Sequence, residues 1–157
     1  MVSGAPPSEA QADSVLIEAE SSFEAGLIDA ARNLYREASS LFTRLMDMAP
    51  NEAKLALYMV KASYCDFMMA YCEAIDLKKR LDEAVMKGQE ASPEDVSRLK
   101  LLARIADRYL KEAVLRLERL RSSTDDEAIR EAVGEVIRMI GKKVEAFVEF
   151  RDEVEVL

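Results

Sequence analysis

Apolar residues recur along this chain at the three- and four-residue spacing that is typical of helices. Between about residues 28 and 48, this spacing places Leu34, Ala38 and Leu41 on one face of a helix. A longer stretch, from about residue 51 to 86, has two apolar faces instead of one. No stretch alternates with a period of two, so the pattern predicts an all-α fold without strands.

Capping and breaking residues divide the chain into five predicted helices. Ser8 stands before the first helix as an N-cap, and Gly26 ends it. Ser92 and the proline after it begin the fourth helix, and Ser123 or Thr124 is expected to cap the fifth. The expected ranges are about 8–25, 28–48, 51–86, 92–121 and 125–151.

The five helices predict a single-domain bundle. Residues 8–86 are expected to form a three-helix, up-down-up core. Residues 92–153 are expected to form an antiparallel helical hairpin that packs against this core. The remaining segments, 1–7 and 154–157, are expected to be flexible ends.

The second apolar face of the long third helix needs a cover, because a stripe of this size is rarely left in water by a soluble monomer. Its members are Tyr58, Ala62, Cys65, Met69 and Cys72. We expect the C-terminal hairpin to bury it through residues such as Leu102, Tyr109, Val136 or Ile140. Lys61, Asp66 and Glu73 interrupt the apolar run on different sides, which favours a buried core helix over a membrane span.

Composition argues against an enzyme. The chain has no His, which removes Ser-His-Asp and Cys-His catalysis and imidazole metal ligands. There is also no phosphate-binding loop. A net charge of −8 without a broad basic face is unfavourable for nucleic-acid binding. We therefore expect no catalytic residue, metal, cofactor or nucleic-acid partner.

The two cysteines, Cys65 and Cys72, lie two turns apart on one helix, a separation of about 10 Å. This is too far for a disulfide within the helix, and no C-x-x-C metal motif exists. Asp66 and Glu73 beside them could act as paired carboxylates, but acids on the wet side of a helix are ordinary. Buried thiols in a reducing cytoplasm are the favoured interpretation.

The first two predicted helices carry a recognisable pattern of small and aromatic residues. Its members are Gly26, Ala31, Leu34, Tyr35 and Ala38. The Gly, Ala, Tyr and Ala spacing resembles a tetratricopeptide hairpin, but Pro50 comes about two turns too late for that repeat. The longer second helix resembles the MIT domain, a three-helix module that binds C-terminal helices of ESCRT-type filament proteins. The resemblance covers about residues 12–80 and implies a groove beside the third helix for a partner's amphipathic helix.

The leading hypothesis is thus a non-catalytic interaction or scaffold module. The residues expected to contact a partner, between the second and third helices, are Leu41, Leu45, Met48, Met68, Tyr71 and Ile75. One alternative is a tetratricopeptide-like adaptor, and another is a structural homo-oligomer whose fourth and fifth helices form the subunit interface. Gly134 and Gly141, one heptad apart, predict that another helix approaches the fifth helix closely, from within the chain or from a second subunit.

A basic stripe marks the fourth helix. Its members are Lys100, Arg104, Arg108 and Lys111, at helical spacing on one face. The stripe could bind an acidic partner or a phosphate backbone. The favoured interpretation is that it faces the acidic first helix, the fifth helix or solvent.

Overall fold

The computed structural model describes residues 6–157, which fold into five α-helices without a strand. The helices are α1 (Glu9–Glu24), α2 (Ile28–Met46), α3 (Glu52–Met86), α4 (Pro93–Ser123) and α5 (Glu127–Glu155). The all-α, five-helix prediction is therefore confirmed. The expected flexible start, residues 1–7, lies mostly outside the described residues. At the other end, α5 continues beyond the expected limit, and Val154 is buried, so residues 154–157 are not simply a loose tail.

Short polar side chains begin the helices where the sequence places them. The Ser8 hydroxyl accepts a hydrogen bond from the Gln11 amide at 3.0 Å, and the Asn51 side chain accepts one from the Lys54 amide at 2.9 Å. Gly26, with a φ of +79°, makes the left-handed turn between α1 and α2 that a residue with a Cβ rarely adopts.

The cap of α5 differs from the expected one. The Asp126 carboxylate, not Thr124 or Ser123, accepts the hydrogen bond from the Ile129 amide, at 3.1 Å. Thr124 instead accepts one from the Asp126 amide at 3.2 Å. A carboxylate is favoured at this position because the N-terminus of a helix carries a partial positive charge.

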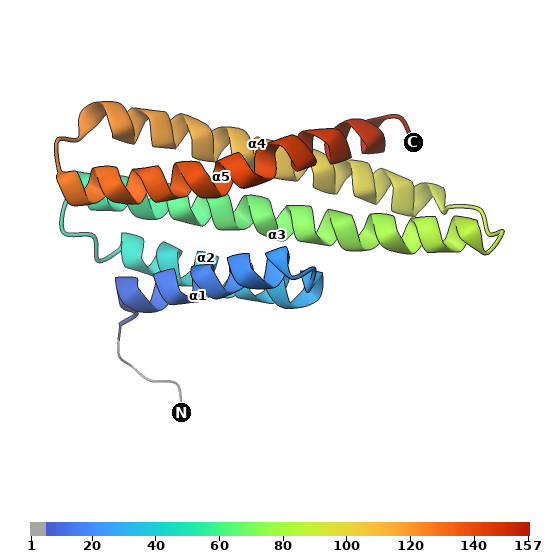
Figure 1. Cartoon of the computed structure of the whole chain (residues 1–157), viewed down its shortest axis with the longest axis horizontal. Helices are drawn as coiled ribbons and strands as arrows, with labels where there is room; N and C mark the ends of the chain where they lie inside the picture. The colour runs from blue at the N-terminus through green and yellow to red at the C-terminus, as the bar shows by residue number, and fades with distance from the viewer. Residues whose placement is uncertain (1–5) are drawn as a thin grey trace.

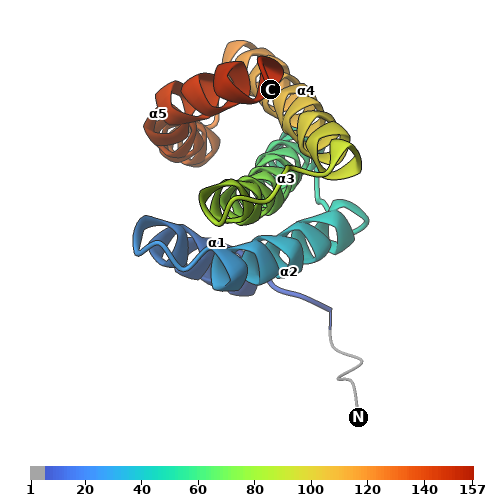
Figure 2. The same ribbon diagram turned by 90° about the vertical axis from the view of Figure 1, so that its right-hand side faces the viewer.

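The helices form three layers, with α3 in the middle. The α1–α2 hairpin covers one side of α3, and the α4–α5 hairpin covers the opposite side (Figures 1 and 2). Consecutive helices run antiparallel (Figure 1). The far end of α3 extends beyond α1 and α2, and there a smaller apolar cluster forms from Leu77, Leu81, Leu99 and Val154 among others.

Aromatic rings fix α5 on α3. Phe147 is fully buried and makes edge-to-face contacts with Phe67 and Tyr71, at centroid distances of 5.0 and 5.1 Å. Tyr71 also contacts Phe23 of α1, with centroids 5.8 Å apart. One ring of α3 therefore packs simultaneously against the first and the last helix.

The second apolar face of α3 is buried, but the expected cover is wrong. Tyr58 packs against Phe42 of α2, and its hydroxyl reaches Glu9 of α1 at 3.3 Å. The α1–α2 hairpin, not the C-terminal hairpin, therefore covers this end of the stripe, because α2 must itself bury a strongly apolar face against α3. Met69 is only half-buried, whereas Cys65 and Cys72 are fully buried.

We expect Phe147→Ala to lower the free energy of unfolding by about 3–5 kcal/mol, because it removes a buried ring between two layers. Urea unfolding followed by circular dichroism measures this change. The matched control, Val85→Ala, removes an exposed apolar side chain and should stay within about 0.5 kcal/mol. Equal losses for both variants would contradict this account of the core.

Candidate functional site

The expected partner-binding residues do not form an open groove between α2 and α3. Leu41, Leu45, Met68 and Tyr71 are buried in the core of the chain itself. Of the remaining two, Ile75 is half-buried and Met48 is exposed. The apolar faces of α2 and α3 fill each other, so this set offers no continuous surface to a partner.

The basic stripe on α4 lies beside the C-terminal half of α5. Arg104 pairs with Glu155 at 3.3 Å, and Lys111 pairs with Asp107 at 2.7 Å. Lys100 is half-buried and Arg108 is exposed. The stripe therefore faces α5 and solvent, two of the three surroundings expected for it.

Asp107 connects this stripe to α5, because it also accepts a hydrogen bond from Arg151 at 2.8 Å. Burial by itself would raise the pKa of Asp107, but the hydrogen bonds from Lys111 and Arg151 outweigh burial and lower it. The carboxylate thus stays ionised and holds two cations of the outer layer in place.

Inside the bundle, several hydrogen-bonding side chains surround the Glu20 carboxylate. It accepts hydrogen bonds from the Tyr35 hydroxyl, from the Tyr64 hydroxyl at 2.8 Å and from Lys143 Nζ at 3.1 Å. The Lys143 ammonium also lies 5.5 Å from the centre of the Phe23 ring. These residues, which we call the Glu20 cluster, join α1, α2, α3 and α5.

The sequence contains a signal for this cluster that pattern analysis missed. Lys143 falls between Ile140 and Phe147 on the buried face of α5, and its side chain is only 4% exposed. A charge in an apolar seam requires a buried partner. Glu20, next to the buried Ala19, supplies it from the first helix.

Burial keeps the potential nucleophiles of the core protonated. It raises the pKa of the Tyr35 and Tyr64 hydroxyls, and the nearby Glu20 carboxylate raises the pKa of both further. Burial also raises the pKa of Cys72 to about 12 and that of Cys65 well above its ordinary value. At neutral pH these groups are phenols and thiols, which serve as hydrogen-bond donors and packing groups.

A second buried lysine pairs with α1 in the same way. Lys61 of α3, which is 7% exposed, contacts Asp13 at 2.8 Å and lies 5.4 Å from the centre of the Phe42 ring. Lys54, also of α3, pairs at 2.6 Å with Glu9, which lies one turn before Asp13 on α1. The acids of α1 are thus matched by lysines of α3 and α5, and not by the basic stripe of α4.

Asp66 and Glu73 do not form a paired carboxylate site with the thiols. Asp66 accepts a hydrogen bond from the Ser39 hydroxyl at 2.6 Å, and burial raises its pKa. Glu73 is half-buried a further two turns along α3. Within residues 6–157 there is no group of three or more Cys, Asp or Glu side chains placed to hold a metal ion.

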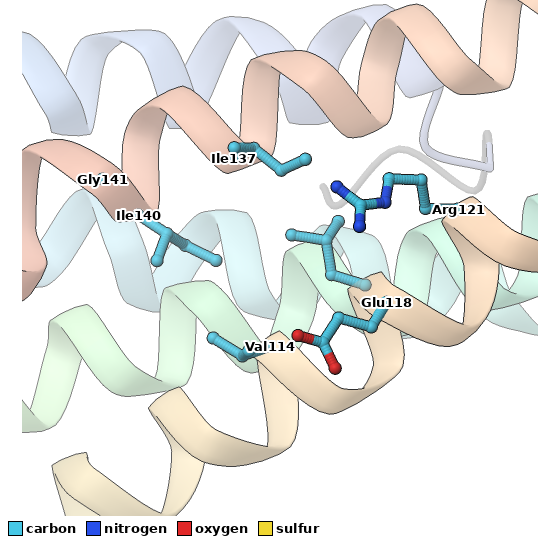
Figure 3. A pocket seen from close by; sticks show the side chains of 7 residues that line it. Val114, Glu118, Arg121, Ile137, Ile140 and Gly141 are labelled. Carbon is cyan, nitrogen blue, oxygen red and sulfur yellow. The ribbon is translucent and has the colours of Figure 1, made fainter.

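An apolar hollow of about 290 Å³ opens between α4 and α5. Side chains from both helices converge on it (Figure 3). It is lined by Val114, Leu117, Glu118, Arg121, Ile137, Ile140 and Gly141. We call this feature the α4–α5 groove. Ile137 is 40% exposed within it, whereas Leu117 and Ile140 are buried.

Gly141 lines this groove, and neither it nor Gly134, one heptad earlier on α5, lies in a tight contact. A Cβ added at Gly141 would meet no atom within 4 Å, and one at Gly134 would meet only the Arg138 guanidinium, at 3.8 Å. The close approach expected at these glycines is therefore not made by a neighbouring helix within residues 6–157.

Comparison of the chain with protein-family models, curated proteins and solved structures gave no match. The resemblance of residues 12–80 to MIT and tetratricopeptide hairpins stays a prediction. Among the described residues, no helix combines the length and the apolarity that a membrane crossing requires.

We expect Glu20→Ala to destabilise the protein by about 3–5 kcal/mol, because it leaves the buried Lys143 ammonium without its counter-charge. The matched control on the same helix is Glu18→Ala, which removes an exposed carboxylate and should change stability by less than about 0.5 kcal/mol. Chemical denaturation at pH 7 measures both. A loss no larger for Glu20→Ala than for Glu18→Ala would show that the cluster contributes little.

Stability is expected to fall as the pH rises above about 9–10, where Cys and Tyr side chains ionise in the unfolded chain. The pKa of Tyr35 and of Tyr64 is raised in the folded protein, so the native state retains protons that the unfolded state releases. Urea midpoints between pH 7 and 11 measure the decline. Tyr64→Phe should make the decline shallower, and an unchanged slope would contradict the assignment.

Proposed function

We propose that this chain is a non-catalytic protein–protein interaction or scaffold module whose docking surface is the α4–α5 groove. The observation that carries the proposal is the hollow itself, where apolar side chains and an unfilled glycine face solvent. A concave surface that brings several apolar side chains together is a common form of interaction site.

The shape of the groove favours the apolar face of a helix over a small molecule. Its volume of about 290 Å³ is at the lower limit for pockets that enclose a ligand, roughly 300–1,000 Å³. A trough between two helices instead accepts side chains at helical spacing from a third helix. Glu118 and Arg121 at the border supply polar partners of both signs.

The interior chemistry supports a binding role over catalysis. The tyrosines and thiols are held protonated inside the bundle, and the Glu20 carboxylate is occupied by three donors. The same buried, unpaired thiols are compatible with a reducing compartment, which supports the proposal of a cytoplasmic location. An adaptor that used the α2–α3 face is less well supported, since Leu41 and Leu45 are buried.

Site-specific photo-crosslinking tests the groove as the docking surface. We expect a photoreactive amino acid at Ile137, introduced into the full chain in its native cells, to give a discrete crosslinked product. The same group at Leu27, which is exposed at the α1–α2 turn, should not. Adding Gly141→Leu, which fills the hollow, should abolish the product from position 137.

The product must also depend on the groove. Equal crosslinking from positions 137 and 27, or a product that survives Gly141→Leu, would contradict the proposal. Gly141→Leu should leave the helical circular dichroism intact, because no atom lies within 4 Å of the new Cβ.

A further inference from the structure

The partner that this groove fits best is another molecule of the same chain. We propose that α5 of a second copy packs antiparallel on α5, over the α4–α5 groove, about a two-fold axis that passes close to Gly141. This inference rests on the proposed function, because it names the occupant of the same groove.

One row of α5 is apolar and incompletely buried. Its members are Gly134, Ile137, Gly141, Val144 and Val148, at the alternating three- and four-residue spacing of a helix-pairing seam. None of the five is buried within the chain, since each is half-buried or exposed. Two members of the row, Ile137 and Gly141, line the groove beside α4 (Figure 3).

The row is complementary to itself when it is reversed. In an antiparallel pair centred on Gly141, that glycine meets its own copy. Ile137 lies four residues before the axis and Val144 three residues after it, so Ile137 contacts Val144 of the second copy with an offset of one residue, about 1.5 Å along the helix. Gly134 then lies opposite Val148, so a residue without a side chain faces a branched one. Glycine at the crossing point lets two helix backbones approach closely, which accounts for the open space at its missing Cβ.

Charge along the edge of this row is complementary in the same register. Arg138 and Glu145 lie seven residues apart on the solvent-facing flank of the row, and the midpoint between them falls beside Gly141. An antiparallel pair therefore places each Arg138 near Glu145 of the other copy. Within residues 6–157 neither residue has an ion-pair partner. A parallel pair would instead set like charges against each other.

A two-fold axis is also the arrangement that closes. An isologous interface uses the same patch on both subunits, so the contact made by residue i with residue j is repeated by j with i. The paired positions of the apolar row and the Arg138–Glu145 pair all have midpoints within half a residue of Gly141. Binding of an unrelated helix would not require that small residues of α5 lie opposite large ones, or that Arg138 lie opposite Glu145, when the helix is paired with its own reversed copy.

Sedimentation velocity on the full chain tests the second copy directly. We expect a concentration-dependent species of twice the 17.6 kDa chain mass. Arg138→Glu or Glu145→Arg alone should weaken the dimer by about tenfold, and the double exchange should restore it. The control is Glu135→Arg, an exposed change away from the row that should have no effect.

A cysteine crosslink tests the register. Under mild copper-catalysed oxidation by dissolved oxygen, Gly141→Cys should give a covalent dimer, because two copies of this position meet at the axis. Gly134→Cys, the matched change one heptad earlier, should not crosslink alone but should crosslink when mixed with Val148→Cys. The native thiols Cys65 and Cys72 are buried and leave the readout clean.

The outcomes separate this inference from the proposed function. A strictly monomeric chain overturns the second-copy proposal, and so does a dimer that is insensitive to the Arg138 and Glu145 exchanges and gives no crosslink with Gly141→Cys. A monomer whose position 137 still crosslinks to a different protein would leave the groove as a docking surface with another occupant. If the chain is monomeric and position 137 gives no crosslinked product, both the second-copy proposal and the proposed docking surface are wrong.

Discussion

The rest of the fold depends on the need to bury α3 on nearly every side. Its 35 residues include an apolar run whose buried members point in several directions around the helix, among them Tyr58, Tyr64, Phe67 and Ala70. A single neighbouring helix can cover only one stripe of such a surface. Two helical hairpins cover it from opposite sides (Figure 2). One hairpin precedes α3 in the chain and the other follows it, so each connects to α3 through a loop. The three-layer architecture follows from this one helix.

Burial of α3 between two hairpins does not by itself determine how the two hairpins are placed relative to each other. The Glu20 cluster links them. Glu20 of α1 and Lys143 of α5 come from opposite layers and meet beside α3, with tyrosines of α2 and α3 completing the contact. A buried ion pair of this type contributes little net stability compared with well-packed apolar residues. It does, however, penalise any arrangement that separates the two charges, because each would then be buried alone. The cluster thus favours one placement of the layers over alternatives with equal apolar burial.

The helices and most of their ends could be predicted from the sequence, because capping residues and the 3.6-residue period act locally. Ser8, Asn51 and Pro93 each stand at a helix start for a reason contained in a few neighbouring residues. The identity of the neighbours could not be predicted in this way. The stripe from Tyr58 to Cys72 is recognisably apolar, but its period does not distinguish a cover by α2 from a cover by α4. For the same reason Leu41 and Tyr71 were expected in a groove although the chain fills that space itself. Gly134 and Gly141 were the sequence signal closest to the α4–α5 groove, since they mark a helix face made for close contact.

The fold of a single chain does not explain why α5 has glycine at these two positions. Each lowers the stability of a helix interior by about 1 kcal/mol relative to Ala, and no neighbour within residues 6–157 needs the space left at Gly141. The inner face of α5, by contrast, is densely used, with Phe147 packed against two rings and Lys143 paired with Glu20. The inner face of α5 is therefore packed closely against its own chain. Its outer flank carries two glycines that lower helix stability and that the fold of the single chain does not need. A contact outside the chain, in which two backbones approach across the missing side chains, would offset this cost, and that asymmetry between the two sides of α5 is the physical reason to look for a partner there.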